Sequence, residues 1–212
     1  MLLGVIPARG GSKTIPRKNL HPLNGKPLID YTIEAAKASK LDDFVVSTED
    51  EEIKEHCSQF CKVIVRPDEL AQDATPTLPA IQHAVAEYEK HIKVYGVTVD
   101  GVMTLQPTSP LRTTKDINRV IDLFLESNTD SLYSGYYIGI KHKNRPYDKR
   151  KEEPHFQRNG AIFITKRELI DQGKLWSDNV LEFEMPKTQS IDIDDYEDLL
   201  ITEAILSKGE IQ

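Results

Sequence analysis

The sequence predicts an α/β fold in which helices cover both faces of a mostly parallel sheet, giving three layers. Short apolar runs alternate along the chain with longer amphipathic stretches, which is the order that a parallel sheet with helical crossovers requires. The 212 residues suit one domain, residues 1–212. A core of this size needs neither disulfide bonds nor a structural metal ion.

The first half of the chain supplies three predicted strands and three predicted helices. Residues 2–6 are an apolar run that predicts a strand. In the helix predicted at 27–39, Leu28, Ile29 and Ile33 share one face, and Pro27 suits the first turn. The other elements of this half are a strand at 44–46, a helix at about 50–60, a strand at 63–65 and a helix at about 77–93.

The second half continues the pattern. An apolar run at 102–105 predicts a strand, and the helix predicted at 116–126 places Ile117, Val120, Ile121, Phe124 and Leu125 on one face. Because open α/β sheets bind ligands at the carboxyl ends of their strands, we expect functional residues in the segments that follow strands. The remaining elements are strands at 132–138 and 161–164 and a helix at 196–206.

Charge and cysteine content exclude several classes of protein. The formal net charge is −7, so non-specific binding to DNA or to an anionic membrane is not expected. No apolar run reaches the ~18 residues of a membrane span, and residues 1–9 become polar too soon for a signal peptide, so we expect a cytoplasmic protein. Cys57 and Cys61 lie one helical turn apart, which favours half-buried helix residues over a metal or redox site.

The segment after the first predicted strand has the composition of a phosphate-binding loop. Residues 7–19 contain Gly10 and Gly11, which allow a ligand to approach the backbone closely, and the cations Arg9, Lys13, Arg17 and Lys18. Backbone N–H groups together with positive charge suit a polyphosphate. The spacing is neither the dinucleotide-binding fingerprint nor the P-loop. An exposed basic turn is the alternative.

A second polar segment, residues 105–112, follows the strand at 102–105. Its two prolines fix the backbone, while Gln106, Thr108 and Ser109 offer hydrogen-bonding groups, as in the wall of a substrate site. The alternative is a simple connection to the next helix, with Thr113 or Thr114 as the N-cap. Arg66 also follows a strand and is a candidate for the same cleft.

A third segment, residues 190–198, pairs two carboxylates. Alternation of isoleucine and aspartate in a strand would place Asp192 and Asp194 on the same side, where they suit Mg²⁺ together with phosphate oxygens. Helix N-capping by Asp194 or Asp195 is the other interpretation, and both can hold at once. Residues 141–151 carry six cations, which predict a solvated loop or a functional basic segment.

Together these segments resemble the acylneuraminate cytidylyltransferase family, the CMP–sialic acid synthetases and their relatives. The resemblance covers nearly the whole chain and implies a Rossmann-like nucleotidyltransferase fold, Mg²⁺ as cofactor, and transfer of CMP from CTP to a nine-carbon 2-keto sugar acid. The motifs that carry it, in order, are residues 6–13 with 16–19, 46–50, 66–71, 105–112, 159–164 and 190–194.

The resemblance also implies roles for individual residues. The catalytic cations are Arg9, Lys13 and Lys18, and the metal carboxylates are Asp192 and Asp194. The nucleotide-binding residues are Ala8, Gly10, Gly11, Ser12, Asn19, Arg66, Thr75 and Thr77. The acceptor-binding residues are Gln106, Thr108, Ser109, Arg158 and Asn159. The partners are CTP and an anionic sugar, and the assembly is a homodimer.

Two features depart from the family pattern. The arm before the motif at 159–164 is short, about residues 135–157, and is basic. The family often reads Arg-Pro-Asn-Gly where this chain reads Gln157-Arg158-Asn159-Gly160. We expect the arm to line the acceptor pocket, with Arg158 pairing with a carboxylate. A different anionic acceptor, or a catalytically idle nucleotide-binding module, are the alternatives.

Overall fold

The computed structural model describes residues 1–138 and 155–209 and contains a seven-stranded sheet of order β5-β4-β1-β6-β8-β7-β9. Neighbouring strands are parallel except for β8, which is antiparallel to β6 and β7. The prediction of a mostly parallel sheet is therefore confirmed. The strands are β1 (Leu2–Pro7), β4 (Asp43–Thr48), β5 (Lys62–Val65), β6 (Gly101–Leu105), β7 (Ser131–Ile138), β8 (His155–Lys166) and β9 (Val180–Glu184).

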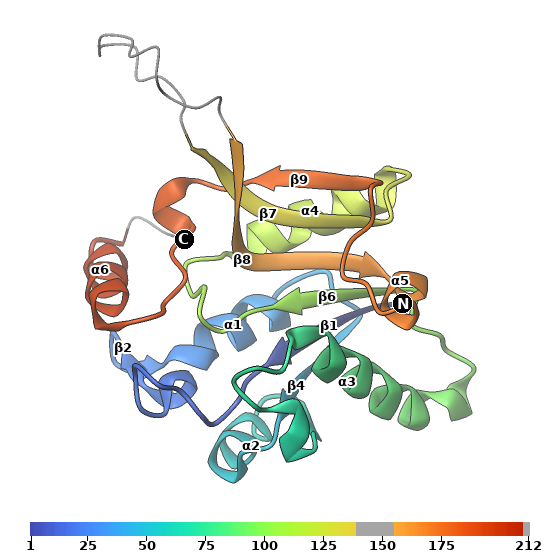
Figure 1. Cartoon of the computed structure of the whole chain (residues 1–212), viewed down its shortest axis with the longest axis horizontal. Coiled ribbons are helices and arrows are strands. Elements are labelled where there is room, and N and C mark those ends of the chain that lie inside the picture. The colour runs from blue at the N-terminus through green and yellow to red at the C-terminus, as the bar shows by residue number, and fades with distance from the viewer. Residues whose placement is uncertain (139–154, 210–212) are drawn as a thin grey trace, which may run out of the picture.

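Helices cover both faces of the sheet, so the three-layer prediction is also confirmed. Helices α1, α2 and α4 pack on one face and α3 and α5 on the other, while α6 lies beyond the carboxyl ends of β1 and β6 (Figure 1). The helices are α1 (Leu28–Lys37), α2 (Glu51–Cys57), α3 (Thr77–Ile92), α4 (Thr114–Glu126), α5 (Arg167–Asp171) and α6 (Tyr196–Ser207). A small hairpin, β2 (Pro22–Leu23) and β3 (Lys26–Pro27), and the 3₁₀ turns η1 (Lys18–Leu20), η2 (Asp68–Leu70), η3 (Lys93–Tyr95) and η4 (Lys187–Gln189) complete the fold.

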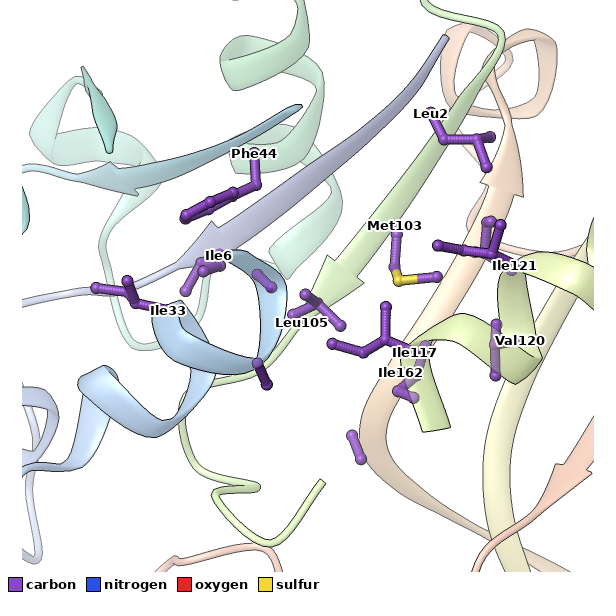
Figure 2. Packing of buried hydrophobic residues seen from close by; sticks show 14 of the residues in the cluster. Leu2, Ile6, Ile33, Phe44, Met103, Leu105, Ile117, Val120, Ile121 and Ile162 are labelled. Atoms are coloured by element: carbon purple, nitrogen blue, oxygen red, sulfur yellow. The ribbon is translucent and has the colours of Figure 1, made fainter. Parts of the chain in front are cut away.

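The central strand β1 is apolar throughout because both of its faces are buried. Leu2 and Ile6 belong to the core under α1, α2 and α4, whereas Leu3 and Val5 belong to the core under α3 and α5. Figure 2 shows the first of these cores, where Ile6 lies near α1 and Met103 of β6 near α4. A rigid double-sided core thus fixes the strand ends from which the loops of the site emerge.

A third, smaller apolar cluster ties three distant segments together at this edge. Ile15 from the loop after β1, Ile193 from the segment before α6, and Leu199 of α6 are all buried in it. Two segments predicted to be functional are therefore anchored side by side through their isoleucines.

Three details differ from the sequence-based expectations. Strand β9 was not predicted: charged residues alternate with apolar ones in it, and only Phe183 is buried. Residues 191–194 were expected to form a strand, but they have no strand partner and belong to no sheet. Helix α2 ends at Cys57, which is fully buried, and Cys61 lies beyond the helix and is partly buried, so the expectation of two half-buried helix residues is only partly right.

Among the helices of residues 1–138 and 155–209, none combines the length and apolar character that crossing a membrane requires.

Candidate active site

Two adjoining cavities lie beyond the carboxyl ends of the parallel strands. The first, of about 320 Å³, is lined by residues that follow β1, β5 and β6. The second, of about 390 Å³, is lined by residues of β7, β8, η4 and the start of α6. Asp192 lines both cavities, so the two are joined at this carboxylate. This edge of the sheet is where open α/β folds bind their ligands.

The two glycines of the loop after β1 serve different purposes. A Cβ at Gly10 would lie 2.3 Å from Oδ2 of Asp50, so only glycine fits there, and its N–H donates to Oε1 of Glu49 at 2.7 Å. A Cβ at Gly11 would meet nothing within 4 Å, and this residue lines the first cavity. Gly11 therefore leaves room for a ligand, whereas Gly10 packs the loop onto the neighbouring strand end.

Ala8 does not line either cavity, although the family resemblance implied a nucleotide contact. Its side chain is fully buried in the core, and its N–H donates to the carbonyl of Ser47 at 2.9 Å. Ser12 and Asn19 do line the first cavity. Asn19 is buried, and its Nδ2 donates to the carbonyl of Arg9 at 2.8 Å, which fixes the curvature of the loop.

The four cations of the loop make three different kinds of contact, of which Arg9, Lys13 and Lys18 make the first two. Arg9 lines the first cavity and pairs with Asp73. Lys13, predicted as a catalytic cation, is exposed and lines neither cavity, but its Nζ lies 2.9 Å from Oδ2 of the same aspartate. Nζ of Lys18, which also lines the cavity, donates to the carbonyls of Ile193 at 2.8 Å and Asp194 at 3.0 Å. Lys18 thereby connects the glycine loop to the segment that carries the paired aspartates.

Arg17 does not belong to the cavity. Its guanidinium pairs with Asp50 and Glu52, and the side chain lies outside the lining of both cavities. Of the four loop cations considered for phosphate binding, Arg17 therefore serves the structure of the loop.

Arg66 is buried in the wall of the first cavity, as expected from its place after β5. Its Nε and Nη2 lie 3.1 and 2.9 Å from Oε2 of Glu49, whose other oxygen accepts from Gly10. Glu49 is a residue that the sequence reasoning did not assign to the site. It follows β4 just as Gly10 follows β1, and because β1 and β4 are adjacent parallel strands, the two meet.

The loop between β5 and α3 forms the opposite wall. Thr75 and Thr77 both line the cavity, as the resemblance implied, and Oγ1 of Thr75 donates to the carbonyl of Glu69 at 2.9 Å. The same wall contains Gln72 and Asp73, which the sequence reasoning did not single out.

The segment after β6 is partly a wall and partly a connection. Gln106 and Thr108 line the first cavity, but Ser109 is fully buried and lines neither. Thr113 is the N-cap of α4 and forms a capping box with Asp116, so the alternative interpretation of this segment is also right.

The buried side chain of Arg112 fixes the backbone of this segment by hydrogen bonds. It is buried and donates to the carbonyls of Gln106 at 3.2 Å and Ala161 at 3.0 Å and to the hydroxyl of Thr32 at 2.7 Å. Burial lowers the pKa of Arg112 to about 10, which still leaves it a cation at neutral pH.

Arg158 and Asn159 both line the second cavity. Asn159 is buried: its Nδ2 donates to Ser190 at 2.9 Å, and its Oδ1 accepts from Ser134 at 2.7 Å, so its amide braces the cavity floor. The guanidinium of Arg158 lies 4.4 Å from the ring centre of Trp176. The sequence reasoning did not assign Lys187, Ser190 and Asp198, which also line this cavity. The lining also includes Tyr136 and Gln157, which belong to the arm that was expected to line the acceptor pocket.

The two aspartates are brought together, although not by a strand. Asp192 and Asp194 both line the first cavity because Ile191 and Ile193 are anchored in the apolar cluster under α6. Asp192 is exposed at the cavities, and partial loss of hydration there raises its pKa. A hydrogen bond from Thr108 works in the opposite direction, and the charge of Asp194 raises the pKa further.

The N-cap interpretation holds for Asp195 and not for Asp194. Asp195 accepts from the N–H groups of Glu197 at 2.9 Å and Asp198 at 3.1 Å and completes a capping box. Neither Asp192 nor Asp194 caps the helix, and Oδ1 of Asp194 lies 3.9 Å from Nζ of Lys18. Within residues 1–138 and 155–209 no group of three or more His, Cys, Asp or Glu side chains is arranged for a metal ion. A hard cation held here would need oxygen atoms from a substrate or from water.

Part of the predicted arm falls outside the described residues. Residues 139–154, which include the six cations at 141–151, are not among them. The described ends of the arm, residues 135–138 and 155–157, belong to β7 and β8 and contribute Tyr136 and Gln157 to the second cavity.

Comparison with known proteins places the chain in a family. An N-acylneuraminate cytidylyltransferase of Streptococcus agalactiae is 28% identical over 92% of this chain, which spans 51% of that protein. The chain thus spans about half the length of this relative. A CMP-N,N'-diacetyllegionaminic acid synthase of Legionella pneumophila is 30% identical over 99% of this chain and 97% of its own length.

The fold has solved counterparts. The structure of a CMP:2-keto-3-deoxy-manno-octonic acid synthetase complexed with CTP superposes with a TM-score of 0.73 at 17% identity, covering 98% of this chain and 99% of that one. Residues 3–172 match the sequence profile described as Cytidylyltransferase. The chain therefore belongs to the cytidylyltransferase family.

Proposed function

We propose that the protein transfers CMP from CTP to an acidic sugar, a sialic acid or related nonulosonic acid, with release of pyrophosphate. The observation that carries this proposal is the joining of two cavities at Asp192, one with a glycine loop and cations, the other with a separate polar lining. The similarity to relatives named for sialic and legionaminic acids supports the acceptor class.

The first cavity is assigned to CTP. Arg9, Lys13 and Lys18 supply positive charge beside Gly11, where nothing blocks the approach of a phosphate to the backbone. Ser12, Asn19, Arg66, Thr75 and Thr77 line or buttress the rest of this pocket. Gly10 contributes by holding the loop, since its N–H is already bonded to Glu49.

Magnesium fits the donor set of the paired aspartates. Two carboxylates beside a phosphate pocket match the preference of Mg²⁺ for one or two protein carboxylates plus substrate oxygens. Partial loss of hydration and the charge of Asp194 raise the pKa of Asp192, whereas Thr108 and Lys18 lower it, so a cation beside this carboxylate would be favourable. When bound, Mg²⁺ would neutralise charge on the phosphates of CTP. Asp192 and Asp194 would hold it, and Lys18 would keep their segment in place.

The reaction is an in-line displacement at the α-phosphorus. The anomeric hydroxyl of the acceptor forms the new P–O bond, its proton leaves, and the bond to the β-phosphate breaks, with its electrons departing on pyrophosphate. Such transfers depend on positioning and charge stabilisation more than on covalent chemistry by the protein. Arg9 and Lys13 would neutralise the charge that builds up on the leaving pyrophosphate.

The second cavity is assigned to the acceptor. Arg158 and Lys187 provide positive charge for a carboxylate, and Gln157 and Ser190 provide polar contacts for hydroxyl groups. Gln106 and Thr108 lie in the first cavity beside Asp192, where the two substrates would meet. Another anionic acceptor, or binding of CTP without turnover, are the alternatives that an assay has to separate.

A homodimer is part of the proposal. An exposed patch contains Tyr137 of β7, Trp176 of the segment before β9, Glu182 and Arg158, and its charges would complement those of a second copy. Light scattering should report a dimer that Trp176→Ala weakens. Tyr95→Ala, at an exposed aromatic residue on η3, is the control and should leave the dimer intact.

Because CTP is a cytoplasmic metabolite, we place the reaction in the cytoplasm.

Pyrophosphate release tests the function. Each of the four nucleoside triphosphates is combined with a panel of nonulosonic acids and other anionic acceptors, in the presence of Mg²⁺. We expect release only with CTP and a nonulosonic acid. Release with another anionic acceptor would reassign the second cavity, and CTP binding without any release would identify a binding module.

A further inference from the structure

One carboxylate in the nucleotide cavity contacts both of the cations that we assign to the outer phosphates of CTP. Oδ1 of Asp73 accepts from Nη1 of Arg9, and Oδ2 lies 2.9 Å from Nζ of Lys13. Asp73 itself lines the cavity. Hydrogen bonds from Lys13 and Arg9 lower the pKa of Asp73, so the carboxylate is ionised at neutral pH. In the structure, both cations are therefore already engaged by an anion of the protein.

The position of Asp73 does not depend on these ion pairs. The turn that carries it is closed by a hydrogen bond from the N–H of Thr75 to the carbonyl of Gln72 at 3.0 Å. Two further bonds, from Gln72 Nε2 to Asp68 O and from Thr75 Oγ1 to Glu69 O, both 2.9 Å, tie the turn to η2. A substitution at Asp73 should therefore leave the turn in place and remove only the carboxylate.

Charge balance in the cavity shows what this carboxylate does. Four cations (Arg9, Lys13, Lys18 and Arg66) are matched by four carboxylates (Glu49, Asp73, Asp192 and Asp194) in and beside the first cavity. Arg66 is committed to Glu49. As long as Asp73 stays on Arg9 and Lys13, the site has no net positive charge to offer a triphosphate.

We propose that Asp73 is a positioning residue that stands in for phosphate in the empty site. Its carboxylate pairs with Arg9 and Lys13 in the ligand-free protein, and the two cations exchange this carboxylate for phosphate when the triphosphate binds. Competition from Asp73 therefore lowers the affinity for CTP and favours the release of pyrophosphate. This inference rests on the proposed function, because it assigns the two cations to the phosphates of CTP.

Calorimetric titration with CTP and with inorganic pyrophosphate, each in the presence of Mg²⁺, tests the inference. Asp73→Asn should bind both ligands about three- to tenfold more tightly, because two exposed ion pairs, each worth at most about a factor of five, no longer compete. The gain should shrink at high salt, where exposed charges are screened. Asp68→Asn removes the same charge from the exposed start of the same loop and should stay within about twofold of wild type.

The double variant Arg9→Ala/Asp73→Asn shows whether the gain comes from Arg9. Two gains in pyrophosphate affinity are compared: the gain that Asp73→Asn gives in the wild-type protein, and the gain it gives in Arg9→Ala. The second gain should be smaller. Weaker binding by Asp73→Asn, together with a lower Tm, would mean that the carboxylate merely supports the fold and would overturn the inference, as would unchanged affinity. In either case the proposed function stands if Arg9→Ala loses CTP affinity. It fails if the wild-type protein binds no CTP.

Discussion

The guanidinium of Arg17 donates to both carboxylate oxygens of Asp50, and this pair joins the glycine loop after β1 to the start of α2. Arg17 adopts a φ of 55°, a left-handed conformation that is uncommon for a residue other than glycine. Asp50 also accepts from the N–H of Ile53 at 2.9 Å as the N-cap of α2. It lies where a Cβ on Gly10 would clash. The pair therefore sets the position of a loop whose other side faces the nucleotide cavity.

We expect Asp50→Asn to raise the KM for CTP about three- to tenfold and to cost about 1 kcal/mol of stability, since Asn keeps the N-cap but loses the ion pair. Steady-state kinetics and urea unfolding measure the two effects. Glu52→Gln removes the second, more exposed carboxylate on Arg17 and should change both quantities little. An equal loss in both variants would show that net charge, and not the position of the loop, is responsible.

The stability difference between wild type and Asp50→Asn should depend on pH. The hydrogen bond from Arg17 is the main cause that lowers the pKa of Asp50, so its stabilising effect is present above the ordinary carboxyl pKa of about 4 and is lost as the pH falls below it. Urea midpoints of wild type and Asp50→Asn should therefore differ at pH 7, and the difference should shrink as the pH falls through the lowered folded pKa of Asp50. A difference that does not change between pH 7 and the acid range would indicate that the ion pair contributes little.

Arg9→Ala and Lys13→Ala should each lower kcat/KM for CTP about 10- to 150-fold, the usual cost of losing a charge-assisted phosphate contact. Circular dichroism should show an intact fold, because both side chains are exposed and their ion pairs within residues 1–138 and 155–209 are with Asp73 alone. Lys54→Ala, at an exposed lysine of α2 that pairs with Glu51, is the matched control. Rates near wild type in both loop variants would remove this loop from the active site.

The sequence predicted the strands and helices well where the apolar pattern is strong. Both faces of β1 and β6 are covered, so these strands read as continuous apolar runs. Strand β9 was missed because it lies at the sheet edge with mostly exposed, alternating residues, among which Phe183 alone is buried. Pattern alone does not separate such a segment from a loop.

The site was predicted in outline, and what was missed depends on packing between segments. Asp192 and Asp194 share a cavity as expected, but the reason is the burial of Ile191 and Ile193 under α6, not strand geometry. Glu49 lies in the motif at 46–50, but its contacts with Gly10 and Arg66 follow only from knowing that β1, β4 and β5 are neighbours. Asp73 is one of many surface acids in the sequence, and only the fold brings it to Arg9.

Asp192→Asn should abolish the response to Mg²⁺ and lower turnover at least about 100-fold, yet stabilise the ligand-free protein. Burial raises the pKa of Asp192, so its ionised form is less favourable in the folded than in the unfolded chain, and this cost is fully present above the folded pKa. Asn removes the charge and can still accept from Thr108, so we expect a small rise of the Tm at pH 7, of about 1 °C or less because Asp192 is exposed to solvent.

Thermal unfolding with and without Mg²⁺ and CTP checks both halves of this prediction. Wild type should be stabilised by the pair of ligands far more than Asp192→Asn is. Glu197→Gln, at an exposed residue in the first turn of α6, is the control and should keep both activity and ligand response. A lower Tm in Asp192→Asn without ligand would mean that the carboxylate stabilises the fold and is not held for a cation.

Specificity for the acceptor should depend on the two cations of the second cavity. Lys187 begins the turn η4, whose backbone is fixed by hydrogen bonds from Gln189 to Pro186 at 2.9 Å and from Ser190 to Lys187 at 3.1 Å. The guanidinium of Arg158 lies 4.4 Å from the ring centre of Trp176, and its planar group can pair with a carboxylate. Both side chains line the second cavity and are exposed to solvent.

We expect Lys187→Ala and Arg158→Ala each to raise the KM for the acceptor about tenfold or more and to leave the KM for CTP nearly unchanged, which is the pattern of a lost ground-state contact. Initial rates with each substrate varied in turn measure this. Lys174→Ala, at an exposed lysine that lines neither cavity, should change neither constant. A rise in the KM for CTP alone would show that the second cavity belongs to the nucleotide, and the assignment of the acceptor would then be wrong.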